Sequence, residues 1–201
     1  MTRRVRPLLA AALLAAALTG CGGATTAASV PAAPPAVTPT TAPAAPATAA
    51  PLPASTPVRV RIPSAGVDAS PVLRLGLAAD GTVEVPPVSD GDKIGWYTKG
   101  VTPGETGPAV LIGHFDTARG PGVLKDVSRV RTGDEVSVTR ADGSTAVFRV
   151  RELEQVDKKT FPTAKVYGDT TRPELRVITC GGELTDGHRP DNIILYADLV
   201  G

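Results

Sequence analysis

The sequence predicts an all-β domain that follows a secretory leader and a long unstructured linker. Short segments rich in β-branched residues recur through residues 58–201, and glycine, proline and Asp-Gly pairs separate them. Helical periodicity is scarce in the same region. Many short strands at close spacing are typical of an antiparallel barrel or sandwich. At this length we expect one domain with a real core.

Residues 1–20 have the layout of an export signal. Three arginines lie within the first six residues, a run of alanine and leucine follows, and the segment ends in Leu18-Thr19-Gly20-Cys21. The apolar run is shorter than the roughly 20 residues that a spanning helix needs. The ending resembles the bacterial lipobox, which implies cleavage before Cys21 and a lipid on its sulfur. An ordinary cleaved signal and an uncleaved anchor are the alternatives.

Residues 21–57 are predicted to form a disordered tether. After Cys21 the segment is almost entirely Ala, Pro, Thr, Gly, Ser and Val, without charged or aromatic residues. At roughly 3.1 Å per residue where extended, it could reach on the order of 100 Å. We therefore expect an extracytoplasmic domain, anchored to the outer face of the cell membrane by an N-terminal lipid and reaching into the cell wall.

The domain itself, residues 58–201, contains a series of predicted strands and little helix. Apolar and charged residues alternate over 58–62, and Asp142-Gly143 between two alternating runs is a hairpin signal. One short turn or helix is expected near 123–130 and another near 162–167. The predicted strands are 58–62, 69–75, 82–85, 109–114, 135–140, 145–154, 175–180 and 192–198.

Charge argues against nucleic acid as a partner. The net charge is +1, and neither a basic stripe nor an aromatic ladder is evident in the sequence.

Cys180 is the candidate nucleophile. It ends a β-branched run, and Gly181-Gly182 behind it permits close backbone approach, so we expect the thiol at a strand end facing a cleft. If Cys21 carries a lipid, Cys180 has no disulfide partner in an oxidising compartment. A free thiol there is either buried as a small apolar side chain or used in chemistry.

His114 and Arg189 complete the candidate constellation. His114 ends another apolar run, and an imidazole beside a thiol can take its proton and later protonate a leaving amine. Arg189 precedes the last predicted strand and could place positive charge near a developing oxyanion. Taken alone, His114 could instead bond to Asp116 as a loop cap, and Arg189 could pair with Asp191.

Together these segments resemble the sortase family. Val177-Ile178-Thr179-Cys180 resembles the TLxTC signature. Leu111 to Asp116 resembles the end of the sortase histidine strand, and Thr132 to Val136 resembles the step into a later strand. Cys180-Gly181-Gly182 with Asp191-Asn192 points toward the actinobacterial class F group.

The resemblance implies an eight-stranded β-barrel with one or two short helices, and a cysteine transpeptidase. Cys180 would cleave an LPXTG-like sorting signal of a surface protein through a thioacyl enzyme, His114 would act as acid and base, and Arg189 would stabilise the oxyanion or hold substrate. The acceptor would be an amine of peptidoglycan or of a pilin. Thr179 and Asn192 are expected to contact substrate, and His188 or Asn192 is the substitute if Arg189 is not the functional cation. No cofactor and no metal is expected.

Three other interpretations compete with the sortase interpretation. An L,D-transpeptidase would carry a Ser-His-Gly-Cys run, which is absent. A metal site built from His114, Asp116, His188 and Cys180 lacks paired close spacing. The non-enzymatic alternative is a cell-envelope lipoprotein with a ligand-binding β domain, in which Cys180 is buried and resists alkylation.

Overall fold

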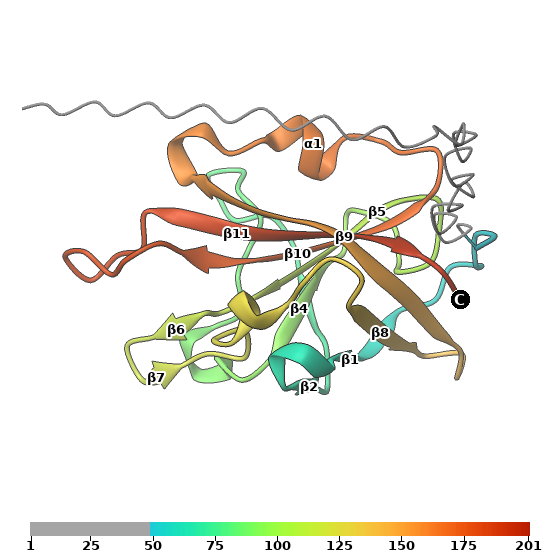
Figure 1. Ribbon diagram of the computed structural model, residues 1–201, viewed down its shortest axis with the longest axis horizontal. Helices are drawn as coiled ribbons and strands as arrows, with labels where there is room; N and C mark the ends of the chain where they lie inside the picture. The colour runs from blue at the N-terminus through green and yellow to red at the C-terminus, as the bar shows by residue number, and fades with distance from the viewer. Residues whose placement is uncertain (1–48) are drawn as a thin grey trace, which may run out of the picture. The chain divides into compact units, whose positions relative to one another are not determined.

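The computed structural model describes residues 49–201, and its dominant feature is one large sheet (Figure 1). The predicted leader, the lipobox with Cys21 and the tether up to residue 48 lie outside the described residues. The sheet has nine strands in the order β2-β1-β8-β9-β11-β10-β5-β4-β3. Its strands are β1 (Pro57–Ile62), β2 (Val67–Ala69), β3 (Leu73–Leu75), β4 (Ile94–Tyr97), β5 (Gly107–Gly113), β8 (Glu135–Arg140), β9 (Thr145–Asp157), β10 (Pro173–Gly181) and β11 (Asp191–Leu199).

The remaining elements are short. Strands β6 (Asp116–Thr117) and β7 (Gly120–Pro121) pair with each other. The α-helix α1 spans Thr163–Tyr167, and the four 3-10 helices are η1 (Pro63–Ala65), η2 (Val88–Asp90), η3 (Val127–Arg129) and η4 (Lys158–Thr160). The all-β prediction is confirmed, and η3 and α1 lie where the sequence predicted short helical turns.

The sheet differs from the sequence prediction in detail. The predicted strand 69–75 divides into the ends of β2 and β3, and 82–85 contributes only a single bridge between Leu77 and Val83. The sequence pattern missed β4, because it has only four residues and includes Gly95. A Cβ at Gly95 would lie 2.4 Å from a methyl carbon of Leu75, so this glycine lets β3 and β4 pack closely. With these short strands the large sheet has nine strands, where the resemblance implied a barrel of eight.

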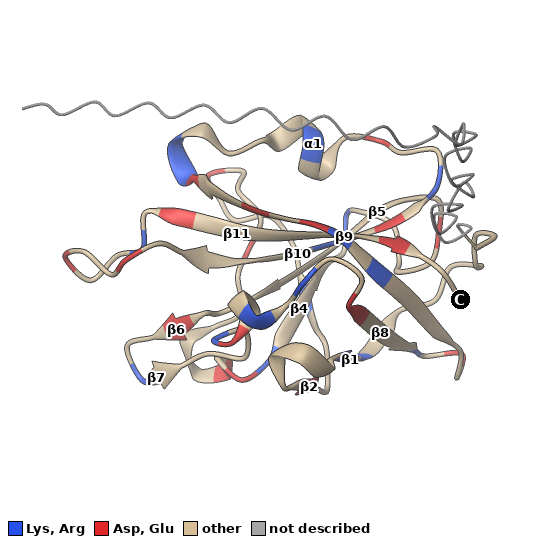
Figure 2. Cartoon of the chain, in the orientation of Figure 1, with Lys and Arg blue, Asp and Glu red and all other residues tan. Residues whose placement is uncertain are grey.

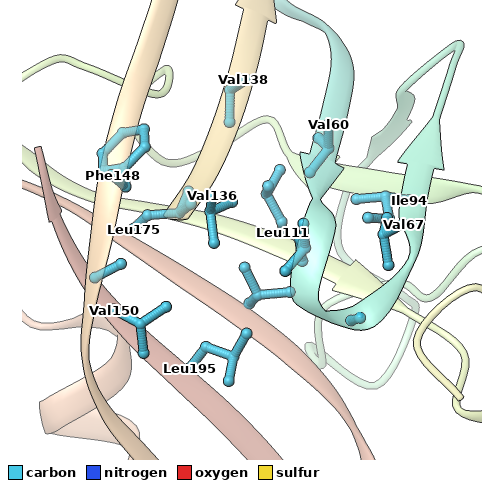
Figure 3. Packing of buried hydrophobic residues seen from close by; sticks show 14 of the residues in the cluster. Val60, Val67, Ile94, Leu111, Val136, Val138, Phe148, Val150, Leu175 and Leu195 are labelled. Carbon is cyan, nitrogen blue, oxygen red and sulfur yellow. The ribbon is translucent and has the colours of Figure 1, made fainter. Parts of the chain in front are cut away.

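One face of the sheet encloses the main hydrophobic core (Figure 3). Alternate residues of each strand point to it, as Leu175 and Val177 do on β10 and Val136 and Val138 do on β8. The labelled side chains in Figure 3 that converge there are Val60, Val67, Ile94, Leu111, Val136, Val138, Phe148, Val150, Leu175 and Leu195.

The opposite face of the central strands is covered in part by α1, so β5 and β10 are buried on both sides (Figure 1). A second apolar cluster joins Val110, Ile112, Ile178 and Ile194 of the sheet to Val166 of α1. Strands β5 and β10 are parallel, and strands buried on both faces read as continuous apolar runs. This explains why 109–114 and 175–180 showed little alternation in the sequence.

The β8–β9 hairpin forms where Asp142-Gly143 predicted it. Gly143 has φ +84°, a conformation that glycine adopts without strain. The Asp142 carboxylate accepts hydrogen bonds from the backbone N–H and the hydroxyl of Ser144, at 2.9 and 2.6 Å. The turn therefore sets the register in which Val138 opposes Ala146.

Residues 49–56, which the sequence analysis placed in the tether, lie against the domain. Ala49 N–H donates to the carbonyl of Leu199 at 3.0 Å, and Leu52 N–H donates to that of Gly104 at 2.8 Å. The guanidinium of Arg140, which is 1% exposed, donates to the carbonyl of Pro53. In the part of the chain that the structure describes, no helix is long and apolar enough to cross a membrane.

Candidate active site at the ends of β5 and β10

The parallel register of β5 and β10 brings the predicted thiol and imidazole together. Val177 is paired with Leu111 and Ile178 with Ile112, and continuing this offset puts Cys180 level with His114, the residue that follows β5. Both side chains therefore lie on the face opposite the main core. On the other side of β10, Cys180 is paired directly with Asn192 of β11. His114, Cys180 and Asn192 therefore form a row across the end of β5 and the adjacent strands β10 and β11.

This row lies in a large groove. The groove has a volume of about 1370 Å³, and its lining includes His114, Cys180 and Asn192. Apolar residues of the second cluster extend along it from the reactive row. They include Val110, Ile112 and Ile178 from the sheet, Tyr97 from β4, and Phe161 and Tyr167 from the η4–α1 segment. The arrangement suits an extended ligand with apolar side chains whose reacting group lies beside Cys180.

His114 is held by the backbone on two sides. Its Nε2 lies 2.6 Å from the carbonyl oxygen of Pro86, and its own carbonyl accepts a hydrogen bond from Leu124 N–H at 2.9 Å. Because a carbonyl only accepts, Nε2 donates in this contact, and Nδ1 is the ring nitrogen left to exchange a proton. Pro86, rather than a carboxylate, therefore fixes the orientation of the His114 ring.

Cys180 is a half-buried free cysteine. Its Sγ lies 3.5 Å from Nζ of Lys158, the first residue of η4. A partly exposed thiol in contact with a cation is accessible to a reacting partner, unlike a cysteine sealed in the core.

Arg189 links the β10–β11 loop to the segment that follows His114. Its Nε lies 3.0 Å from both carboxylate oxygens of Asp116, its Nη2 lies 2.7 Å from Oδ2, and its Nη1 donates to the carbonyl of Gly182. The guanidinium carbon also lies 4.5 Å from the centre of the Phe115 ring. The guanidinium borders a smaller cavity of about 400 Å³ rather than the large groove.

The Arg189–Asp116 pair perturbs both groups. The hydrogen bonds from Arg189 hold the pKa of Asp116 below its ordinary value. The pKa of Arg189 is raised, chiefly by the Asp116 hydrogen bonds and to a smaller extent by the charge of Cys180. Neither loop alternative considered from sequence occurs. His114 Nε2 contacts Pro86 while Asp116 binds Arg189, and Asp191 accepts a hydrogen bond from Gln155 at 2.6 Å.

The other predicted site residues lie around this centre. Thr179 is 3% exposed, and its Oγ1 has no hydrogen-bond partner within residues 49–201. His188 is exposed on the β10–β11 loop, where its backbone bonds with that of Thr185. Among the described residues, His, Cys, Asp and Glu side chains do not gather in groups of three or more that could hold a metal ion.

Sequence reasoning missed Lys158 and the aromatic wall of the groove. Lys158 follows a predicted strand in a Lys-Lys pair, which reads as an ordinary solvated surface. Phe161 precedes a helix of five residues and Tyr167 ends it, and this helix is too short for a periodic signal. Their approach to Cys180 and to the groove depends on pairing between β9 and β11, which no local pattern encodes.

Comparison with known proteins identifies the family. A family model described as the Sortase domain matches residues 60–200. A search of curated proteins gives no match. Similar solved structures include a lid mutant of sortase A from Corynebacterium diphtheriae, with 16% identity, 75% of this chain and 73% of that chain covered, and a TM-score of 0.57.

Two further structures have the same fold. Sortase C-1 from Actinomyces oris has 20% identity, with 72% of this chain and 75% of that chain covered, and a TM-score of 0.55. A sortase D5 transpeptidase from Clostridium perfringens has 19% identity, 73% and 79% coverage and a TM-score of 0.53. At these identities the structures bear on the fold, while the family model covers most of the chain and all three predicted catalytic residues. The chain therefore belongs to the sortase domain family and is a sortase-type cysteine transpeptidase.

Proposed function

We propose that this enzyme cleaves an LPXTG-like sorting signal of a surface protein and transfers it to an amine of the cell wall or of a pilin. The row of His114, Cys180 and Asn192 in the large groove is the observation that carries the proposal. The apolar lining suits the leucine and proline of such a signal. The Cys180-Gly181-Gly182 and Asp191-Asn192 runs support a class F assignment.

The first half-reaction would form a thioester. His114 Nδ1 takes the proton of the Cys180 thiol, and Sγ attacks the carbonyl carbon of the Thr–Gly bond. The tetrahedral intermediate then collapses, the C–N bond breaks, and the protonated His114 gives its proton to the departing amine. Arg189 holds the β10–β11 loop against the His114 segment and adds positive charge near the sulfur.

The second half-reaction would restore the enzyme. His114 takes a proton from the incoming amine, the amine nitrogen attacks the thioester carbon, and the C–S bond breaks. The sulfur is reprotonated, and the acyl group leaves as a new amide. Water in place of the amine gives hydrolysis. Asn192 and Thr179 are proposed to contact the substrate beside the reacting carbonyl.

We also propose that the enzyme is exported and lipidated at Cys21, with most of residues 21–57 as its tether. This arrangement would keep the active site on the outer face of the membrane, within reach of surface proteins and peptidoglycan. The Leu18-Thr19-Gly20-Cys21 run supports it.

The direct test is intact mass of the full-length protein incubated with an LPXTG-type peptide and an amine. Wild type is expected to form a thioacyl adduct and an amide product, and Cys180→Ala is expected to form neither while keeping its thermal unfolding profile. Product formation by Cys180→Ala would refute the mechanism. A reactive thiol without any adduct, across a panel of sorting-signal peptides, would refute the substrate class.

A further inference from the structure

Lys158 lies where a cation can act on the reacting sulfur. Its Nζ is 3.5 Å from Cys180 Sγ and donates to the carbonyl of Arg189 at 2.8 Å. Its backbone N–H also donates to the carbonyl of Pro190 at 3.0 Å. Lys158 is therefore tied to the β10–β11 loop at both its backbone and its side chain.

The segment that carries Lys158 is placed by the sheet. The last residue of β9, Asp157, is paired with Asp191 of β11, one residue from the Cys180–Asn192 pair. The Asp157 carboxylate then accepts a hydrogen bond from Lys159 N–H at 2.7 Å and begins η4. Lys158 thus leaves the sheet beside the start of β11, the strand that pairs with the end of β10.

The other two charged or titratable groups of the site have different partners. The guanidinium of Arg189 is bound to Asp116 and Gly182, and His114 Nε2 is bound to Pro86. Within residues 49–201, Lys158 is the only lysine or arginine whose side chain makes a hydrogen bond to Cys180. The positive charge in contact with the sulfur is therefore the ammonium group of Lys158.

We propose that Lys158 is a catalytic residue that stabilises negative charge at the reaction centre. It would stabilise the thiolate before attack and the oxyanion after it. The oxyanion is two bonds from Sγ, so an ammonium group that contacts the sulfur also reaches it. This inference rests on the proposed function for the oxyanion step, whereas the thiolate step stands on the Lys158–Cys180 contact alone.

Alkylation of Cys180 tests the thiolate step without any peptide substrate. The full-length protein is treated with iodoacetamide, which is neutral, or iodoacetate, which is an anion, and adducts are followed by intact mass. Lys158→Met is expected to slow iodoacetamide labelling about tenfold, and Lys158→Arg is expected to keep most of the rate. Lys159→Met removes the same charge from the neighbouring exposed side chain and is expected to match wild type.

The ratio of the two labelling rates distinguishes the loss of a charge from a change in structure. A loosened loop changes access for both reagents alike, whereas loss of a cation beside the sulfur slows the anionic reagent more. Lys158→Met is therefore expected to lower the iodoacetate-to-iodoacetamide rate ratio by about threefold or more. Added salt should bring wild type toward the variant. A Lys158→Met variant with wild-type rates and ratio would overturn the proposal.

The second arm uses the LPXTG-type peptide and an amine. Lys158→Met is expected to lower kcat more than it changes KM, because the oxyanion exists only after attack. If Cys180 of the wild type is alkylated as expected but no peptide reacts, the substrate assignment is wrong. The alkylation rates then still support the role of Lys158 in stabilising the thiolate. A peptide adduct that resists hydroxylamine and maps to Lys158 would overturn it, since the lysine would then be an acyl acceptor rather than a cation.

Discussion

The buried charge of Glu174 provides a sharp stability test of this structure. Glu174 on β10 has a side chain that is 5% exposed, and it lies 2.7 Å from the guanidinium of Arg176, which is 2% exposed. Arg151 Nη2 also lies 2.6 Å from its carboxylate. Charged positions gather on this part of β9 to β11 (Figure 2). Arg176 Nε has no hydrogen-bond partner within residues 49–201. The Glu174 carboxylate is therefore needed to offset the cost of burying the Arg176 charge.

Glu174→Gln keeps the shape but removes the charge that pairs with Arg176. Breaking a buried ion pair on one side typically costs about 3–5 kcal/mol. Glutamine retains one acceptor oxygen, so we expect a loss of about 3 kcal/mol in the free energy of unfolding. For a domain of this size, about 1 kcal/mol corresponds to roughly 2–4 °C, so Tm should fall by about 6–12 °C.

The assay is thermal and urea unfolding of the full-length protein at pH 7, followed by circular dichroism. Glu152→Gln is the matched control, because Glu152 is 43% exposed and pairs with Lys165 at the surface of the same region. It should change stability by about 0.5 kcal/mol or less. A Glu174→Gln protein as stable as this control would refute the claim that Glu174 compensates a buried arginine.

The ion pairs of Glu174 also determine how the stability of the protein changes with pH. Burial alone would raise the pKa of Glu174, but the hydrogen bonds from Arg176 and Arg151 hold it below its ordinary value. A depressed pKa contributes stability that is present above the unfolded value, about 4.3, and is lost as the pH falls through the folded value. The difference in the free energy of unfolding between wild type and Glu174→Gln should therefore become smaller as the pH is lowered from about 5 to 3.

Three further changes test the active site. His114→Ala should lower peptide transfer by about 10²–10⁴-fold, because both proton transfers pass through its ring, and steady-state rates of product formation measure this. Asp116→Asn should release Arg189 and lower the rate of peptide transfer about tenfold. Arg189 holds the pKa of Asp116 below its ordinary value, so Asp116 becomes protonated only in acid. The transfer rate of wild type should therefore approach that of the variant as the pH falls below about 4. Gly122→Ala would place a Cβ 2.2 Å from the His114 carbonyl oxygen, so the segment must shift, and transfer should fall while Cys180 remains open to iodoacetamide.

Each of these has a contrasting outcome. Wild-type transfer by His114→Ala would remove His114 from the mechanism, and wild-type transfer by Asp116→Asn would mean that the Arg189–Asp116 pair does not serve catalysis. Gly100→Ala is the control for Gly122→Ala, because its added Cβ would meet its nearest neighbour at an ordinary 3.5 Å. Equal effects at both glycines would refute the argument from close approach.

The sequence by itself determined the fold class and most strands, and it singled out three candidate catalytic residues. Strand alternation and the Asp142-Gly143 turn act over a few residues, so local pattern suffices to predict them. Cys180 and His114 could be singled out because each ends an apolar run, and the family resemblance then related them to each other. Residues 49–56 had no such pattern, and their contacts with Gly104 and Arg140 emerged only in the folded chain.

Only the tertiary structure decided which groups meet. The parallel register of β5 and β10 places His114 opposite Cys180 across 66 residues of sequence, and the β9–β11 pairing brings Lys158 to the sulfur. Arg189 could have paired with Asp191 nearby but bonds to Asp116, 73 residues away. Hydrogen bonds and ion pairs depend on distance in space, and that distance is set by strand register and loop packing, which the local order of residues does not encode.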